Sequence, residues 1–404
     1  MSFRPLLSIH LLLMMSLGAF STVSAQQRMD TVVVPVKRDV TSVVVRSSDS
    51  TTLSLMRSAF NMHGGYRVVE SMSQASFAFS VDPVGSSGAR LSVYSGRPEQ
   101  LQFQQTIAGT SGRNAIFKAV DLAILKTSGR PGFFAGKLTF VSEVTGSPEV
   151  FVSDFLFGEV LRMTQDGAEV VRPRWSPDGR YLVFTSYRKG YPDIYRIDRQ
   201  TNRLDTLVSL KGTNLSARYS PDGSRVAMIL TGKGNAEVYI GDASAGQRRR
   251  FTQTSGDESA PCWSPDGSQV CVASGQSGRV QLYTASSFGV PAELKRLPTN
   301  VSGYCAEPDW NPYDANLISF TAAEGVGYQI GVYDFSKGAA EKITTEAGMA
   351  QLSQWLSDGR HLIYTVKSGI EKRIVLYDTV TRARTVLSPS SLGDVSEASF
   401  LAPR

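Results

Sequence analysis

The sequence predicts a mainly β fold, in which a six-bladed β-propeller follows a small α/β domain, and three observations indicate it. A string built around an aromatic residue and a Ser-Pro-Asp-Gly turn recurs every 44 to 47 residues. A second string, a strand that ends in a short polar residue, recurs at a similar period but out of phase with the first. The segment before these repeats alternates helical and strand patterns instead.

The clearest example of the aromatic string is RPRWSPDG, which begins at Arg172. Its relatives are SARYSPDG, APCWSPDG, EPDWNPYD and LSQWLSDG, whose aromatic residues are Trp175 in the first string and then Tyr219, Trp263, Trp310 and Trp355. One more repeat length leads to Phe400, in EASF. A repeat of this length that contains several short β-patterned runs is typical of a propeller blade, and six occurrences predict six blades.

Each repeat divides into four predicted strands. The aromatic piece is the innermost strand, and the Ser-Pro-Asp-Gly turn reverses the chain into the second. Second strands such as YLVFTSY and VCVAS are apolar on both faces because they pack between neighbouring blades. A basic residue before an apolar one, as at Arg162 and Arg250, marks the outermost strand, where we expect cations to protect the exposed edge against aggregation. The third strands end at Asp154, Asp198, Asp242, Ser286, Asp334 and Asp378.

The offset between the two markers predicts how the ring closes. The third strand ending at Asp154 has no aromatic strand before it, because Pro131 stands where the aromatic residue should be. Phe400, in contrast, has no third strand after it. We therefore expect the C-terminal strand, from about Ser396 to Leu401, to complete the first blade and to remove the free sheet edge.

The first 25 residues have the pattern of an export signal. Arg4 precedes the apolar run LLSIHLLLMMSLGAF, and the small residues Val23-Ser24-Ala25 precede a polar stretch, which predicts cleavage after Ala25. The run is interrupted by His10 and is too short for a membrane anchor. No later segment is apolar enough to span a bilayer, so we expect a mature protein that is not membrane-spanning.

The predicted domains are residues 1–25 as signal peptide, 26–130 as an N-terminal α/β domain and 131–404 as the propeller. The α/β domain should contain a helix in SDSTTLSLMRSAFNMHGG, ended by Gly64, and a second helix in GRNAIFKAVDLAILKTSGRPG. VTSVVVRS, YRVVES, FAFSV, ARLSVYS and LQFQQTIAG read as its strands. The Gly-Arg-Pro-Gly end of the second helix is the expected boundary.

The sequence predicts no catalytic residue, metal site or cofactor. The mature chain has two histidines, His63 at a helix end and His361 at the start of a strand, where we expect a surface position. Neither has a second ligand at a suitable spacing, which argues against both a metal site and a Ser-His-Asp triad. No phosphate-binding glycine motif occurs. The turn aspartates lie on separate blades, too far apart to share a metal: Asp178, Asp222, Asp266 and Asp358.

Charge and cysteine content add two further expectations. The net charge of +6 is spread over 404 residues, so nucleic acid is not an expected partner. Cys262 and Cys271 flank a tight turn and could form a disulfide across the hairpin, or could remain two small buried thiols. The spacing leaves both possibilities open.

The candidate site is the mouth of the central pore. The residues that begin each inner strand differ from blade to blade, although the blade structure does not require this variety. A rim of mixed charges and small residues suits a loop of a protein partner, whereas the alternative interpretation is a set of solvated loop ends. These residues are Arg172 and Arg174, Ser216 and Arg218, Ala260 and Cys262, Glu307 and Asp309, Leu352 and Gln354, and Glu397 and Ser399.

The passage AIFKAVDLAILKTSGRPGFFAGKLTFVSEVTG, followed by EVFVSD and RPRWSPDG, resembles the helix-to-first-blade passage of the TolB family. TolB is the periplasmic component of the Tol-Pal system of Gram-negative bacteria. The export signal, the α/β domain and the six repeats are similar too, although the W-S-P-D-G string alone is less specific because other propellers use it. The resemblance is strongest from about residue 113 to residue 275.

This resemblance implies a non-enzymatic, periplasmic and monomeric adaptor that supports outer-membrane integrity and cell division. TolB proteins bind the lipoprotein Pal at the pore mouth and the inner-membrane protein TolA through a freed N-terminal strand. Carried over by position, the Pal-facing rim includes Thr213, Ser216, Ser259 and Ala260. The family often has an acidic residue where Ala260 stands, whereas this chain has Glu307 one repeat later. The N-terminal segment, whose valines could add a strand to a partner sheet, would use Gln26, Gln27, Arg28, Met29, Asp30, Val32 and Val34.

Two other functions remain open from the sequence. One is an exported propeller module for carbohydrate binding or hydrolysis, and the other is an exported scaffold for an unrelated partner. Gene neighbourhood would separate them from a Tol-Pal adaptor.

Overall fold

The computed structural model describes residues 40–232 and 234–404. The predicted export signal with cleavage after Ala25, and the predicted N-terminal partner segment from Gln26 to Val36, lie outside the described residues. Both stay predictions.

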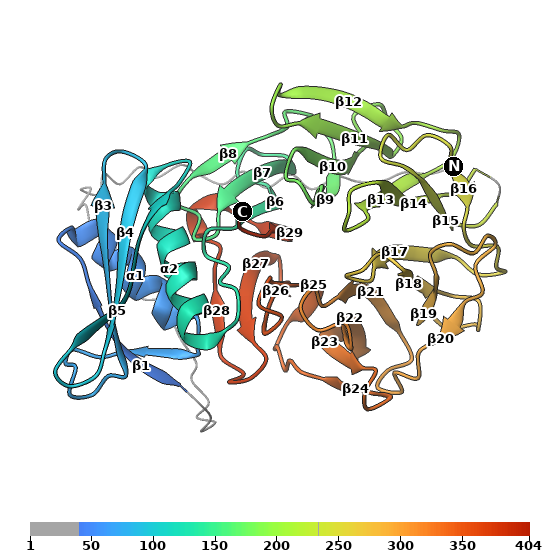
Figure 1. Ribbon diagram of the computed structural model, residues 1–404. Helices are drawn as coiled ribbons and strands as arrows, with labels where there is room; N and C mark the ends of the chain where they lie inside the picture. Colours follow the sequence, from blue (N-terminus) through green and yellow to red (C-terminus); the bar gives the residue numbers. More distant parts are fainter. Residues whose placement is uncertain (1–39, 233) are drawn as a thin grey trace, which may run out of the picture. The chain divides into compact units, whose positions relative to one another are not determined.

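The N-terminal part of the described chain is a mixed sheet covered by two helices (Figure 1). The sheet order is β2-β1-β3-β4-β5, with β1 parallel to both β2 and β3 and the remaining pairs antiparallel. Its strands are β1 (Thr41–Arg46), β2 (Tyr66–Val68), β3 (Phe77–Val84), β4 (Gly88–Ser95) and β5 (Gln100–Ala108).

Both predicted helices are present, and their caps explain their ends. Helix α1 (Ser50–Met62) begins where the Asp49 carboxylate accepts a hydrogen bond from the backbone N–H of Thr52. Helix α2 (Gly112–Ser128) begins at the Ser111 cap and ends at Gly129, whose φ of 73° is readily adopted only by glycine.

The rest of the described chain forms six four-stranded sheets, as the two repeat markers predicted. In each blade the strands are given from the inside outward. Blade 1 contains β29 (Val395–Leu401), β6 (Lys137–Ser142), β7 (Glu149–Asp154) and β8 (Val160–Arg162). Blade 2 contains β9 (Val170–Trp175), β10 (Tyr181–Ser186), β11 (Asp193–Asp198) and β12 (Arg203–Val208). Blade 3 contains β13 (Asn214–Tyr219), β14 (Arg225–Leu230), β15 (Glu237–Asp242) and β16 (Arg249–Arg250).

The remaining three blades follow the same order. Blade 4 contains β17 (Glu258–Trp263), β18 (Gln269–Ser274), β19 (Gln281–Ser286) and β20 (Lys295–Arg296). Blade 5 contains β21 (Cys305–Trp310), β22 (Leu317–Glu324), β23 (Gly327–Asp334) and β24 (Ala339–Lys342). Blade 6 contains β25 (Met349–Trp355), β26 (His361–Ser368), β27 (Glu371–Asp378) and β28 (Arg384–Val386), followed by a short 3-10 turn, η1 (Ser390–Leu392).

The C-terminal strand closes the ring as expected. Strand β29 pairs antiparallel with β6, and Phe400 lies opposite Leu138. Each inner strand also contacts the inner strands of both neighbouring blades, in the circular order β29, β9, β13, β17, β21, β25 and back to β29. Figure 1 shows the same succession of sheets. Since β29 supplies the inner strand of blade 1, the two ends of the propeller sequence are hydrogen-bonded within one sheet.

The basic residues of the outermost strands have a role beyond the one expected. Arg162 donates to the buried carboxylate of Glu149 at the start of β7, and Arg250 donates to Glu237 at the start of β15. The threonine two residues after each arginine donates to the same carboxylate. Each of these arginines therefore fastens the fourth strand to the third, in addition to the edge protection expected from the sequence.

The two cysteines left open by the sequence lie opposite each other in the β17–β18 register. Cys262 and Cys271 are both buried and free. Of the two possibilities, the structure therefore has the pair of small buried thiols.

Candidate functional site

All six inner strands share a backbone irregularity at the mouth of the pore. The third residue of five of these strands, and the fourth residue of β25, has a positive φ between 48° and 60°, although none is glycine. The strand pairing shifts register at the same place in every blade, so each position is a β-bulge. A left-handed backbone conformation costs a non-glycine residue about 1–2 kcal/mol, so six such residues in one ring destabilise the fold unless other contacts offset the cost. The residues are Arg172, Ser216, Ala260, Glu307, Leu352 and Glu397.

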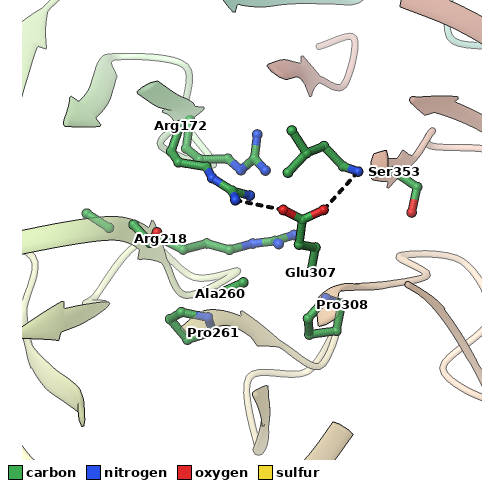
Figure 2. A pocket seen from close by; sticks show the side chains of 11 residues that line it. Arg172, Arg218, Ala260, Pro261, Glu307, Pro308 and Ser353 are labelled. Atoms are coloured by element: carbon green, nitrogen blue, oxygen red, sulfur yellow. Dashed lines mark hydrogen bonds and ion pairs between the residues drawn. The ribbon is translucent and has the colours of Figure 1, made fainter. Parts of the chain in front are cut away.

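The bulges surround a cavity that opens on the pore axis. Measured as the space open to the centre of a water molecule, it has a volume of about 30 Å³. Figure 2 shows charged side chains of blades 2, 3 and 5 converging on it above the small residues of blade 4. Its lining residues are Arg172, Arg174, Ser216, Ala217, Arg218, Ala260, Pro261, Glu307, Pro308, Leu352 and Ser353.

Arg172 joins three blades at the mouth. Its guanidinium donates to Glu307 at 2.7 Å, the ion pair drawn in Figure 2, and its backbone N–H donates to Glu397 at 2.6 Å. Burial lowers the pKa of Arg172, but the charges of Glu307 and Glu397 outweigh it and leave the pKa above its ordinary value. Glu307 also accepts from the backbone N–H of Leu352 at 3.2 Å, so one carboxylate ties blade 5 to blades 2 and 6.

A second ion pair crosses from blade 3 to blade 5. Arg218 donates to the carboxylate of Asp309, whose other oxygen accepts the backbone N–H of Trp355 at 2.9 Å. The Asp309 side chain is only 5% exposed, and it lies behind the cavity wall rather than in it.

Arg174 is the exception among the three arginines. Its guanidinium donates to the backbone carbonyl of Pro173 at 3.2 Å, and within residues 40–232 and 234–404 it forms no ion pair. Burial lowers the pKa of Arg174 to about 10, with smaller contributions in the same direction from Arg218 and Arg172.

The predicted site residues are partly brought together. The cavity wall contains Arg172, Arg174, Ser216, Arg218, Ala260 and Glu307, whereas Asp309 and Glu397 support it from behind. Thr213 and Ser259 precede the bulges and do not line the cavity. Sequence reasoning did not select Ala217, Pro261, Pro308 and Ser353, which directly follow the bulge residues of blades 3 to 6 and also line the cavity.

Exposed apolar side chains surround the mouth on the same rim. The first residues of each inner strand pair with the last residues of the second strand, so the loops between second and third strands lie at the mouth. The tips of three of these loops carry Tyr191, Val326 and Ile370, which are 76%, 100% and 87% exposed. Apolar tips around a charged centre are typical of a protein-binding face.

The opposite rim contacts the N-terminal sheet and helices through a second charged cluster. His361 lies in blade 6 and is fully buried: one ring nitrogen is 2.5 Å from Asp358, and the other is 2.7 Å from the backbone carbonyl of His63. Arg360 forms a two-pronged ion pair with Asp378 beside them. The expectation of a surface position for His361 was wrong, because the end of α1 covers it.

This cluster uses a turn aspartate in an unusual way. In blades 2, 3 and 4 the turn aspartate accepts from the serine two residues before it, as in the bond from Ser176 to Asp178 at 2.5 Å. In blade 6 Leu356 replaces that serine, and Asp358 binds His361 instead. Burial raises the pKa of Asp358, but the charge of His361 and its hydrogen bond outweigh it and leave the pKa low.

His63, Asp358 and His361 also correct the conclusion drawn from sequence spacing. Their ligand atoms lie within 4.8 Å of one another, a grouping that could hold a metal ion. Both ring nitrogens of His361 are engaged in the hydrogen bonds above, however, and a backbone carbonyl can only accept. The contacts of the described residues therefore fit a protonated His361 between acceptors better than a metal ligand.

Comparisons with known proteins agree with this geometry. Residues 125–294 match the family described as the TolB beta propeller domain. This segment, less than half of the chain, is similar to the TolB propeller. The resemblance inferred from the sequence is thereby confirmed.

Two relatives of this family and one solved structure show how far the likeness extends. A Tol-Pal system protein TolB from Desulfosudis oleivorans is 37% identical over 89 residues, which is 22% of this chain and 20% of that protein. The TolB protein of Cereibacter sphaeroides (strain ATCC 17025) is 34% identical over 128 residues, 30% of this chain and 28% of that protein. The crystal structure of TolB from Acinetobacter baumannii is 20% identical, with a TM-score of 0.81 over 93% of this chain and 99% of that one.

The sequence matches and the structural match cover different shares of the chain. The matched segments span less than a third of the length of the curated TolB relatives, whereas the fold agrees with TolB from Acinetobacter baumannii over nearly the whole chain. The fold class, a six-bladed propeller preceded by an α/β region, is therefore established. Across residues 40–232 and 234–404, no helix has both the length and the apolar character needed to cross a bilayer.

Proposed function

We propose that this protein is a periplasmic adaptor of the Tol-Pal system that binds a Pal-like lipoprotein at the mouth of the propeller. The observation that carries the proposal is the coincidence, on one rim, of the charged cavity with the exposed tips Tyr191, Val326 and Ile370. The match to the TolB propeller supports it. The rim residues carried over from the family, Thr213, Ser216, Ser259 and Ala260, belong to two neighbouring blades of this rim.

The second half of the proposal concerns the N-terminal segment. Residues 26–36 engage a TolA-like inner-membrane protein after the export signal, residues 1–25, has been removed. The N-terminal α/β domain then ends at residue 130, and the propeller follows it. The protein acts as a monomer and supports outer-membrane integrity and cell division. The support is the signal pattern and the valine-rich strand in the sequence.

We propose binding rather than catalysis at the mouth. Within the described residues, the ionisable groups of its lining are arginines and a carboxylate held in ion pairs or backbone hydrogen bonds. Such an arrangement recognises a ligand without transferring its protons. The carbohydrate alternative is less well supported, because a cavity of about 30 Å³ holds two or three water molecules rather than a sugar ring.

The test is direct binding between the exported protein and the soluble domain of the Pal-like lipoprotein encoded in the same genome, measured by titration calorimetry. We expect saturable one-to-one binding. Replacing two exposed tips, as Tyr191→Ser with Ile370→Ser, should weaken it roughly tenfold or more, because exposed aromatic and aliphatic anchors dominate interface energies.

The matched control is Phe288→Ser. Phe288 is 75% exposed, as Tyr191 is at 76%, but it follows the end of β19 and therefore lies on the opposite rim. Equal losses from the two variants would contradict binding at the mouth, and no binding by the folded wild-type protein would contradict the Pal partnership.

A further inference from the structure

The three arginines of the mouth share their three neighbouring carboxylates unevenly. Arg172 lies against both Glu307 and Glu397, with nitrogen-to-oxygen distances of 2.7 and 3.9 Å, and Arg218 has Asp309. Arg174 has none of them, within the part of the chain that the structure describes. The cavity therefore contains a guanidinium whose charge is balanced only at a distance.

The carboxylates are not available to move to Arg174. Glu307 accepts from Thr321 at 2.8 Å and from the backbone N–H of Leu352, and Asp309 accepts from the backbone N–H of Trp355. Glu397 is held by the backbone N–H of Arg172. Rotating Asp309 or Glu397 would leave a backbone donor without its acceptor, at a cost of about 1–3 kcal/mol, and rotating Glu307 would break its bonds from Arg172 and Thr321.

The small volume of the cavity beside Arg174 limits the size of the group that it can bind. By the same measure that gives the cavity about 30 Å³, one water molecule needs about 10–15 Å³, so there is room for two or three non-hydrogen atoms. The lining also has short side chains, Ser216, Ala217 and Ala260, and it has one carboxylate, which is already paired. A carboxylate group has the charge, the size and the planar pair of oxygens that a guanidinium binds best.

We propose that the mouth receives a carboxylate side chain of the protein partner, bound by Arg174. This deepens the proposed function and rests on it: the partner's contact loop places an aspartate or glutamate on the pore axis, while its apolar residues contact the exposed tips. Binding would supply the counter-charge that Arg174 lacks and would stabilise its charged form, which burial disfavours.

The first experiment uses a small probe and does not depend on Pal. N-acetyl-aspartate N-methylamide carries one carboxylate, and N-acetyl-asparagine N-methylamide is its uncharged analogue of nearly equal size. Saturation-transfer NMR at constant ionic strength should show binding of the aspartate probe, on the order of millimolar, and at least fivefold weaker binding of the asparagine probe. Equal binding of both probes, or binding of neither, would overturn the carboxylate site.

Substitutions locate the site. Arg174→Gln should abolish the difference between the two probes, and Arg174→Lys should retain part of it because it keeps the charge. Neither change leaves a carboxylate without its partner, so both variants should fold. The matched control is Arg203→Gln on the outer strand β12, 76% exposed and paired with Asp205, which should bind both probes as the wild type does. A probe difference that survives in Arg174→Gln would place the site elsewhere.

The second experiment separates this inference from the proposed function. If the exported protein binds the soluble Pal-like domain, Arg174→Gln should weaken that binding roughly tenfold and reduce its dependence on salt concentration. Pal binding that is unchanged in Arg174→Gln would overturn the inference and leave the proposed function intact. Selective binding of the aspartate probe without Pal binding would overturn the Pal partnership and keep a carboxylate site.

Discussion

The two rims of the propeller both carry buried charge, but they are built in opposite ways. At the junction with the N-terminal helices, Arg360 faces Asp378 and His361 faces Asp358, and the segment after α1 covers them. At the mouth, Arg172 and Arg218 are paired, Arg174 is not, and the cluster is open along the pore. A closed and balanced cluster holds two parts of a chain together, whereas an open and unbalanced one is suited to a ligand.

Glycine makes the close approach at the junction possible. Gly64 has a φ of 70°, and a Cβ atom there would lie 2.3 Å from the Asp378 carboxylate. At the mouth, in contrast, the residues with left-handed backbone are not glycines. Their side chains contribute to the wall of the cavity. The two clusters therefore use left-handed backbone differently: a glycine supplies it beside Asp378, and residues with side chains supply it at the mouth.

The largest expected effect comes from unbalancing the junction. Asp358→Ala leaves His361 buried without its acceptor and should lower the free energy of unfolding by roughly 3–5 kcal/mol, measured by urea denaturation. The control is Asp178→Ala, the equivalent turn position of blade 2, where the carboxylate is exposed and binds only its own turn. The control should lose a small fraction of that amount. Similar losses in the two variants would mean that the junction is not a special cluster.

Unbalancing the mouth should cost less. Glu307→Ala removes one of two acceptors from Arg172 and one of two from the Leu352 N–H, so we expect a loss of about 1–3 kcal/mol in the free energy of unfolding. Glu324→Ala in the same blade breaks an exposed ion pair with Lys342 and should lose at most about 1 kcal/mol. A mouth variant as costly as Asp358→Ala would contradict the comparison.

The junction should also respond to pH through its two histidines. The folded-state pKa of His361 is raised above 6.5: burial opposes the charged form, but Asp358 and Asp378 outweigh it. Its contribution to stability is therefore complete below pH 6.5 and is lost as pH rises through the folded pKa. Burial and the charge of His361 lower the pKa of His63 to about 3. The contribution of His63 to stability is therefore complete above pH 6.5 and is lost as pH falls from 6.5 through about 3.

These opposite signs can be separated by substitution. His361→Gln should flatten the decline in stability above pH 6.5, and His63→Gln should flatten part of the decline below it, each by up to about 1.4 kcal/mol per pH unit. The measurement is the denaturation midpoint across pH 4–9 for each variant against the wild type. Parallel profiles for the wild type and both variants would show that neither histidine changes its protonation on unfolding.

The sequence was sufficient for the ring but not for the junction. The six aromatic strings and their offset from the third strands predicted the blades and the pairing of Phe400 with blade 1, because blade structure is local and repeats. The contact between His361 and the His63 carbonyl joins residues 298 positions apart, and no spacing rule reaches that far. One local signal existed: Leu356 stands where blades 2, 3 and 4 have a serine, so Asp358 needed another partner.

The mouth was predictable in part for a related reason. The variation among bulge residues singled out Arg172, Ser216, Ala260 and Glu307 from the sequence alone. The pairing pattern was not visible there, because three arginines and three acids on four strands can combine in several ways. Which arginine stays unpaired depends on the ring geometry, and only the structure identifies Arg174.

The smallest expected effect tests whether the bulges store strain. Ala260 has a φ of 48° and its side chain is a single methyl group, so Ala260→Gly isolates the backbone. Relief of about 1–2 kcal/mol of left-handed strain should exceed the roughly 0.5–1 kcal/mol that glycine loses in conformational entropy. We expect the free energy of unfolding to rise by about 0.5–1 kcal/mol, in contrast to Ala227→Gly in strand β14 of blade 3, which should lower it. A loss of stability in both variants would show that the mouth backbone is relaxed, and the contrast drawn between the two rims would then rest on charge alone.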